Sequence, residues 1–91
     1  MVSALNEMLL EGTWPNPSRG GPLAVHFALP NGAAAILELF DVAGRLVDSR
    51  AVGFLGEGSH RIETNPVPAG VYYMRLSQGS NVKVKRAIVL D

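Results

Sequence analysis

Apolar and polar residues alternate in short runs along this chain, and clusters of Gly, Pro and Asn separate the runs about every eight to twelve residues. This pattern predicts an all-β sandwich with little room for helix. The run that ends at Pro30-Asn31-Gly32 illustrates the alternation. One of its faces carries large apolar side chains, namely Leu23, Val25, Phe27 and Leu29.

The run from 35 to 42 is apolar on both faces apart from Glu38 and, near its end, Asp41, which predicts a central strand. A hairpin follows at 41–45. Gly44 can take a positive φ there without steric cost, and the Asp41 carboxylate can accept hydrogen bonds from backbone N–H groups of the turn. Residues 46–52 are expected to return as the partner strand.

The second half of the chain predicts three further strands. Residues 59–64 form a short one with Ile62 as its inward anchor, and 65–70 must cross over because two prolines there lack the N–H donor. The strand over 71–76 places Tyr72, Met74 and Leu76 on one side and Val71, Tyr73 and Arg75 on the other.

A turn over 77–81 leads into the last predicted strand. There the alternation places Val82 and Val84 inward and Lys83 and Lys85 in solvent. Arg86 interrupts the alternation, which favours a bulge or an exit from the sheet. At the other end of the chain, residues 8–10 could supply an edge strand.

Composition narrows the choice of function. The 91 residues are enough for one domain spanning 1–91, with 1–12 as a linker or edge strand. Eight basic and eight acidic residues give zero net charge, so no nucleic-acid partner is expected. The lack of Cys leaves stability to the core alone. The C-terminal end is nevertheless basic, because Asp91 is the only acidic side chain after Glu63.

No catalytic residue, cofactor or metal is expected from the side chains present. His26 and His60 fall at positions predicted to point outward, and the acidic residues are scattered. A calcium site built from Asp41, Glu57 or Glu63 stays open as an alternative. Trp14 has two interpretations: a sugar-stacking platform, or, the favoured one, a cover over the open end of the core beside Pro15 and Pro17.

Several motifs stand in a characteristic order: Trp14-Pro15-Asn16-Pro17, Phe27-Ala28-Leu29-Pro30, Leu39 to Arg45, Gly70 to Leu76 and the Lys-rich end. In this the chain resembles the C-terminal sorting domain of proteins exported by the bacterial type IX secretion system. It is also similar to the immunoglobulin-like domain of the flagellar hook-capping protein. The resemblance implies an all-β, immunoglobulin-like β-sandwich of about seven strands, with Tyr72 as the tyrosine of an immunoglobulin-type corner.

The resemblance also implies a function: a non-catalytic sorting and cell-surface attachment module of a larger secreted protein. Its partners would be outer-membrane secretion and attachment machinery and an upstream catalytic domain, and it would pass through the periplasm to the outer-membrane surface or the medium. Carried over by position, the recognition surface comprises Gly70, Val71, Tyr72, Lys83, Lys85 and Arg86, and the structural turn comprises Asp41, Gly44 and Arg45.

Other interpretations of the basic end and of the domain stay open. Lysines on an edge strand also serve simply to keep the edge solvated and unpaired. An exposed edge is compatible with a weak homodimer. The alternative function is a structural or carbohydrate-binding accessory domain, including a contact like that of the hook cap.

Overall fold

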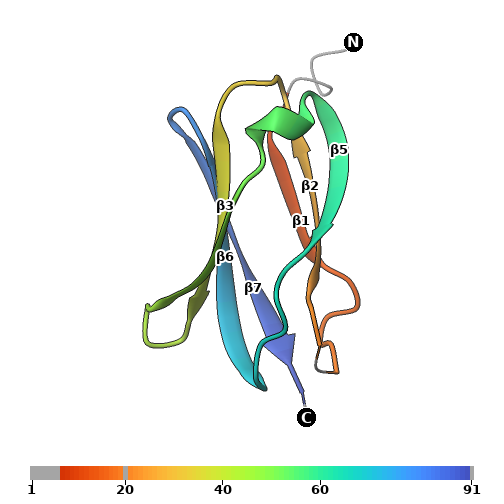
Figure 1. Ribbon diagram of the computed structural model, residues 1–91, viewed down its shortest axis with the longest axis vertical. Coiled ribbons are helices and arrows are strands. Elements are labelled where there is room, and N and C mark those ends of the chain that lie inside the picture. Colours follow the sequence, from red (N-terminus) through yellow and green to blue (C-terminus); the bar gives the residue numbers. More distant parts are fainter. Residues whose placement is uncertain (1–6, 20, 91) are drawn as a thin grey trace.

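The structure, a computed structural model, describes residues 7–19 and 21–90, which form a β-sandwich of two antiparallel sheets lying face to face (Figure 1). The strands are β1 Leu9–Thr13, β2 Ala24–Leu29, β3 Ala35–Asp41, β4 Leu46–Ala51, β5 Gly58–Glu63, β6 Gly70–Gln78 and β7 Asn81–Val89. A 3-10 turn, η2 (Gly53–Leu55), connects β4 to β5. The predicted seven-stranded, all-β sandwich is therefore confirmed.

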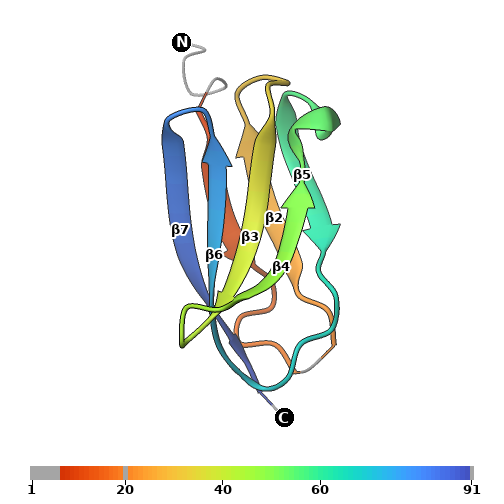
Figure 2. The ribbon, with the colours of Figure 1, turned by 60° about the vertical axis from the view of Figure 1, so that its left-hand side comes forward.

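The strand order is β1-β2-β5 in the three-stranded sheet and β4-β3-β6-β7 in the four-stranded sheet. Figure 2 shows the four-stranded sheet in front, with the other sheet behind it. The central position predicted for 35–42 is confirmed, since β3 lies between β4 and β6. β1 forms an edge strand, while residues 1–6 lie outside the described residues. No helix among the described residues is long and apolar enough to span a membrane.

The core lies between the sheets, where the alternation predicted it. The inward residues of β2 and β6 are nearly inaccessible: Phe27 and Met74 are 1% exposed, and Val25 and Leu76 are 0% exposed. Such side chains contribute most of the folding free energy, at about 1.5–3 kcal/mol for each one fully buried. Ile62 packs against this core from β5, as expected.

The hairpin at Asp41 has the predicted chemistry. The Asp41 carboxylate accepts hydrogen bonds from the N–H groups of Arg45 at 2.9 Å and Ala43 at 3.0 Å, and Gly44 has a φ of 86°. The N–H of Arg45 is the main cause that holds the pKa of Asp41 below its ordinary value of 3.8; desolvation opposes it, and the N–H of Ala43 adds a smaller lowering effect. The Arg45 guanidinium, 3.2 Å from the carboxylate, acts in the same direction.

The crossover before β6 ends in a tyrosine corner. The Tyr72 hydroxyl donates a 2.6 Å hydrogen bond to the carbonyl oxygen of Pro68, four residues upstream. This is the arrangement found near the start of the corresponding strand in immunoglobulin-like sandwiches. The bond ties the proline-containing crossover to the end of the sandwich.

The structure corrects the prediction for the last strand. β6 continues to Gln78 and β7 begins at Asn81, so the connection is a two-residue turn in which Gly79 has a φ of 59°. Such a turn determines the register of the hairpin. Lys83 therefore stands opposite the buried Leu76, on the inner face, and Val82 and Val84 point outward at 53% and 56% exposure.

Three other expectations were wrong. The β6–β7 register runs without a break past Arg86, and the register shifts lie instead in the β1–β2 and β3–β4 pairs. His60 pairs with Phe27 on the inner face, with its ring centroid 5.6 Å from that of Phe27. Trp14 is 75% exposed, so its indole does not cover the core.

Candidate recognition site at the edge of β7

β7 is an edge strand with one side open to solvent for much of its length. It ends the order β4-β3-β6-β7, and every residue from Asn81 to Arg86 is exposed. Only Ala87 and Val89, at its far end, are buried. An edge strand with accessible backbone is a template for pairing with another chain.

The bonds at the far end of β7 identify the side that faces away from β6. There the N–H of Ile88 donates to the Asn16 side chain, and its carbonyl oxygen accepts from the N–H of Ser18. Alternate residues of a paired strand direct their backbone groups to the same side. The N–H and C=O of Val82 and Val84, and the N–H of Arg86, therefore face the same free side.

Residues 16–18 already occupy the far end of this edge. Ser18 forms a parallel bridge with Val89: the Ser18 N–H lies 2.9 Å from Ile88 O, and the Leu90 N–H lies 2.7 Å from Ser18 O. The side-chain amide of Asn16 imitates a peptide group, since its Nδ2 donates to Arg86 O at 3.3 Å and its Oδ1 accepts from Ile88 N at 3.1 Å. The Pro-Asn-Pro motif thus closes the edge from Arg86 onward.

The segment from Val82 to Arg86, which we call the open edge, is left uncovered. None of the described residues hydrogen-bonds the free side of Val82 or Val84. At about 3.4 Å per residue the open edge is about 17 Å long. This is enough for a short strand to pair with it.

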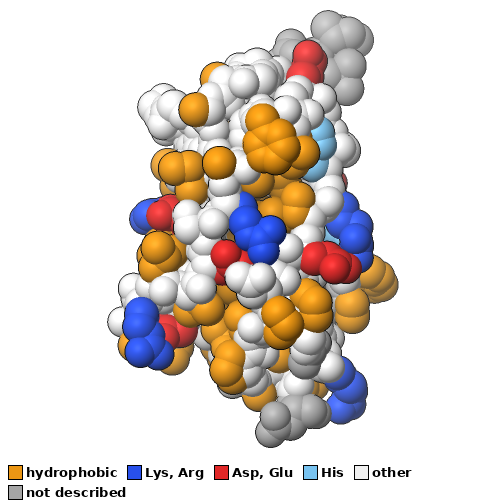
Figure 3. Space-filling view, in the orientation of Figure 1, with side chains coloured by type: hydrophobic (Ala, Val, Ile, Leu, Met, Phe, Trp, Pro, Cys, Tyr) orange, Lys and Arg blue, Asp and Glu red, His pale blue; other side chains and the backbone are white. Residues whose placement is uncertain are grey.

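Three cations line the open edge, on both faces. Lys83 and Lys85 lie on the inner face, opposite Leu76 and Met74, whereas Arg86 lies on the outer face opposite Tyr73. Within the described residues none of the three pairs with a carboxylate. Of the other five cations, four lie within 3.4 Å of an acidic oxygen, namely Arg45, Arg50, Arg61 and Arg75, whereas Arg19 has no carboxylate partner among the described residues. On the face seen in Figure 3, accordingly, most blue side chains lie beside red ones.

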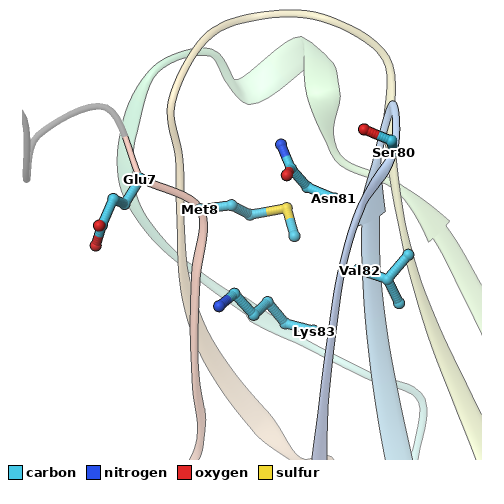
Figure 4. A pocket seen from close by; sticks show the side chains of 6 residues that line it. All are labelled: Glu7, Met8, Ser80, Asn81, Val82 and Lys83. Carbon is cyan, nitrogen blue, oxygen red and sulfur yellow. The ribbon is translucent and has the colours of Figure 1, made fainter.

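A hollow of about 480 Å³ adjoins the inner face of the open edge, between β7 and the start of β1. Its lining comes from Glu7, Met8 and residues 80–83. Figure 4 shows the Lys83 side chain extending from β7 toward β1, below Met8, and the Glu7 carboxylate pointing away from it. The ammonium group is therefore presented to whatever enters the hollow.

The outer face of the open edge carries two exposed valines. Val82 and Val84 stand opposite Ser77 and Arg75 of β6. The exposed Tyr73 (39%) of β6 and Ile36 (46%) of β3 lie further along the same face of the sheet. The charged side chain in its middle is neutralised, because Arg75 Nε and Nη2 lie 3.0 and 2.8 Å from Glu38 Oε1. The open edge thus separates an inner side with two unpaired lysines from an outer side with two exposed valines.

The six residues predicted as a recognition surface fall into two groups. Lys83, Lys85 and Arg86 are exposed together on β7, whereas Gly70, Val71 and Tyr72 pair with Val89, Ile88 and Ala87 at the closed end. Tyr72 is 5% exposed and is bonded to the crossover, so its side chain supports the shape of that end.

Sequence reasoning missed Asn16 and the outward valines. The two-residue Gly79-Ser80 turn was the signal for the valines, because it sets the pairing register. No pattern in the chain identifies Asn16 as the partner of a strand about seventy residues away.

The side chains considered for a calcium site do not gather. The Asp41 carboxylate is engaged by its own turn. Within residues 7–19 and 21–90 there is no group of three or more His, Cys, Asp or Glu placed to hold a metal ion.

Comparison with known families gives a match to the family described as secretion system C-terminal sorting domain, over residues 12–90. The matched region runs from the bulge in β1 to the end of β7 and includes both the Pro-Asn-Pro segment and the open edge. Searches of curated proteins and of solved structures gave no significant match.

Proposed function

Because the chain belongs to the family of secretion system C-terminal sorting domains, we propose that the export machinery recognises it through the open edge of β7. As a member of this family, the domain is non-catalytic, is recognised by the type IX secretion system and serves secretion across the outer membrane. The proposal concerns which surface the export machinery binds and where the exported protein finally lies.

The observation that carries the proposal is the open edge itself. Val82 to Arg86 combine unpaired backbone groups with cations that have no carboxylate partner among the described residues. Strand addition to such an edge obtains affinity from main-chain hydrogen bonds and specificity from the neighbouring side chains. Lys83, Lys85 and Arg86 are then direct contacts, whereas Gly70, Val71 and Tyr72 act by holding the closed end of the hairpin in shape.

Secretion of a reporter tests this assignment. The full chain is fused behind a periplasmic reporter in a host with the type IX system, and the double variant Lys83→Glu/Lys85→Glu is compared with Arg61→Glu. Arg61 is a matched control because it is an exposed cation on β5, the edge strand of the other sheet. We expect the double variant to retain the reporter in the periplasm and the control to export it. Equal export of both would overturn the role of the open edge.

The fate of the exported protein is the other half of the proposal. The parent protein carries an upstream catalytic domain, passes through the periplasm, and reaches the outer-membrane surface or the medium with the help of attachment proteins. Fractionation of the same reporter strain, with protease added to intact cells, measures this fate. A reporter that leaves the cytoplasm and the periplasm but stays protected from the added protease would contradict surface exposure.

One observation favours a second function, carbohydrate binding. Trp14, 75% exposed, borders a hollow of about 290 Å³ that Glu11 and His26 also line. An exposed aromatic face beside polar side chains suits the apolar face and hydroxyl groups of a sugar. Glycan-array binding that is lost in Trp14→Ala would support this function, and no binding by the unaltered chain would reject it.

A further inference from the structure

We propose that the segment that pairs with the open edge is an extended strand in which acidic and apolar residues alternate, with the acidic residues facing the inner side. This inference rests on the proposed function. It specifies the chemistry of the partner, which family membership leaves open.

The two faces of β7 determine the alternation. A strand that adds to the open edge continues the four-stranded sheet, so its own side chains alternate between the same two faces. Those on the inner side lie next to Lys83 and Lys85 and beside the hollow under Met8. Those on the outer side lie next to Val82 and Val84, which are exposed apolar side chains of that face.

Charge makes the inner side selective. Neither Lys83 nor Lys85 has a carboxylate partner within the described residues, so acidic residues opposite them form cross-strand pairs of opposite charge. A lysine or arginine at the same position would stand opposite a like charge. The outer side has two cations: Arg86, at the end that Asn16 closes, and Arg75, which is already paired with Glu38.

A second copy of this chain is a poor occupant by the same reasoning. Antiparallel pairing of two open edges centred on Val84 would place Lys83 of one copy opposite Lys85 of the other. Like charges directly opposite each other destabilise a strand pair. The charge pattern therefore favours a different, acidic chain over the homodimer.

The bonds of residues 16–18 also fix the extent of the added strand. Ser18 and the Asn16 amide occupy the free side from the carbonyl of Arg86 onward. The partner can thus pair only with Val82, Val84 and the N–H of Arg86. About five of its residues engage the edge.

Peptide binding to the purified full chain tests the inference. Three capped nine-residue peptides are compared by fluorescence polarisation: alternating Glu and Val, the same composition in two blocks, and alternating Lys and Val. Light scattering checks that the peptides and the protein are monomeric. We expect the Glu-Val alternation to bind at least about tenfold more tightly than either other peptide, and its affinity to fall with added salt.

Proline substitutions show whether the bound peptide pairs with the open edge. The N–H of Val84 faces the free side, so Val84→Pro removes a donor to the partner while leaving the β6–β7 hydrogen bonds in place. Ala51→Pro is the matched control: Val52 N–H donates to Ala35 O, so the neighbouring amide of Ala51 points away from β3 on the opposite edge strand. We expect Val84→Pro to lose peptide binding and Ala51→Pro to keep it.

The outcomes separate this inference from the proposed function. Equal affinity for the alternating and block peptides, binding that survives Val84→Pro, or a dimer of the protein through the same edge would each overturn the inference. Reporter export that still depends on Lys83 and Lys85 would leave the proposed function standing in those cases. Reporter export that is unchanged by Lys83→Glu/Lys85→Glu would overturn the proposed function itself.

Discussion

The side chain of Asn16 offers a test of how the N-terminal motif is joined to the last strand. Asn16→Ala removes two hydrogen bonds, one to Arg86 O at 3.3 Å and one from Ile88 N at 3.1 Å. A typical hydrogen bond contributes about 0.5–1.5 kcal/mol net, and the exposure and length of these two place each at the lower end. The expected loss is therefore about 1–1.5 kcal/mol in the free energy of unfolding.

Thermal unfolding followed by circular dichroism measures this loss. For a domain of this size, each kcal/mol corresponds to about 4–8 °C in Tm. The matched control is Asn65→Ala, because the exposed side chain of Asn65 makes no hydrogen bond to the described residues. The control should stay close to the unaltered chain.

Amide hydrogen exchange gives the local readout. The N–H of Ile88 bonds to Asn16, whereas the N–H of Val89 faces β6. In Asn16→Ala we expect the exchange of Ile88 to accelerate more than that of Val89. Asn16→Asp keeps the acceptor, so it should largely preserve the protection of Ile88. An unchanged Tm, or equal acceleration at both amides, would refute the reasoning.

Three further predictions concern the fold. Tyr72→Phe leaves the Pro68 carbonyl without its partner and should lower the free energy of unfolding by about 1–2 kcal/mol in urea titration; no change would show that the corner is dispensable. Gly53→Ala would place a Cβ 2.7 Å from Ala35 N and closer still to a neighbouring carbonyl, so it should cost about 3 kcal/mol or more, and a variant of native Tm would contradict this crowding. Because the folded-state pKa of Asp41 is lowered, its carboxylate stabilises the fold above the unfolded-state pKa, and this stabilisation is lost as pH falls through the lower, folded-state value. The stability advantage over Asp41→Asn should therefore be present at neutral pH and shrink as pH falls below about 3.8; a constant difference across that range would contradict the cause assigned to the shift.

Features that depend on near neighbours in the chain were predictable. The period-two pattern of 23–29 identified the buried face of β2, and that of 71–76 identified Met74 and Leu76. The turn at Asp41 was predictable because its donors lie within four residues of the carboxylate. The tyrosine corner was predictable from the family resemblance, and its two partners, Tyr72 and Pro68, are close in the chain.

Orientation on the last strand required the tertiary structure. Alternation divides β7 into two sets of side chains without saying which set faces the core, and the apolar Val82 and Val84 suggested the wrong one. The register with β6 places Lys83 and Lys85 inward instead. They stay exposed because β7 lies at the edge of the larger sheet, where β1 approaches it but leaves a hollow beside Lys83.

The amino-acid sequence alone determined that this chain forms strands, where most of them begin and end, and which family it resembles, because these properties reside in local periodicity, turn chemistry and motif order. Only the tertiary structure decided that Asn16 closes a portion of the β7 edge, and that Lys83 and Lys85 lie on its inner face and Val82 and Val84 on its outer face. These properties arise from contacts between residues far apart in the chain, and their geometry is set by how the two sheets pair and overlap.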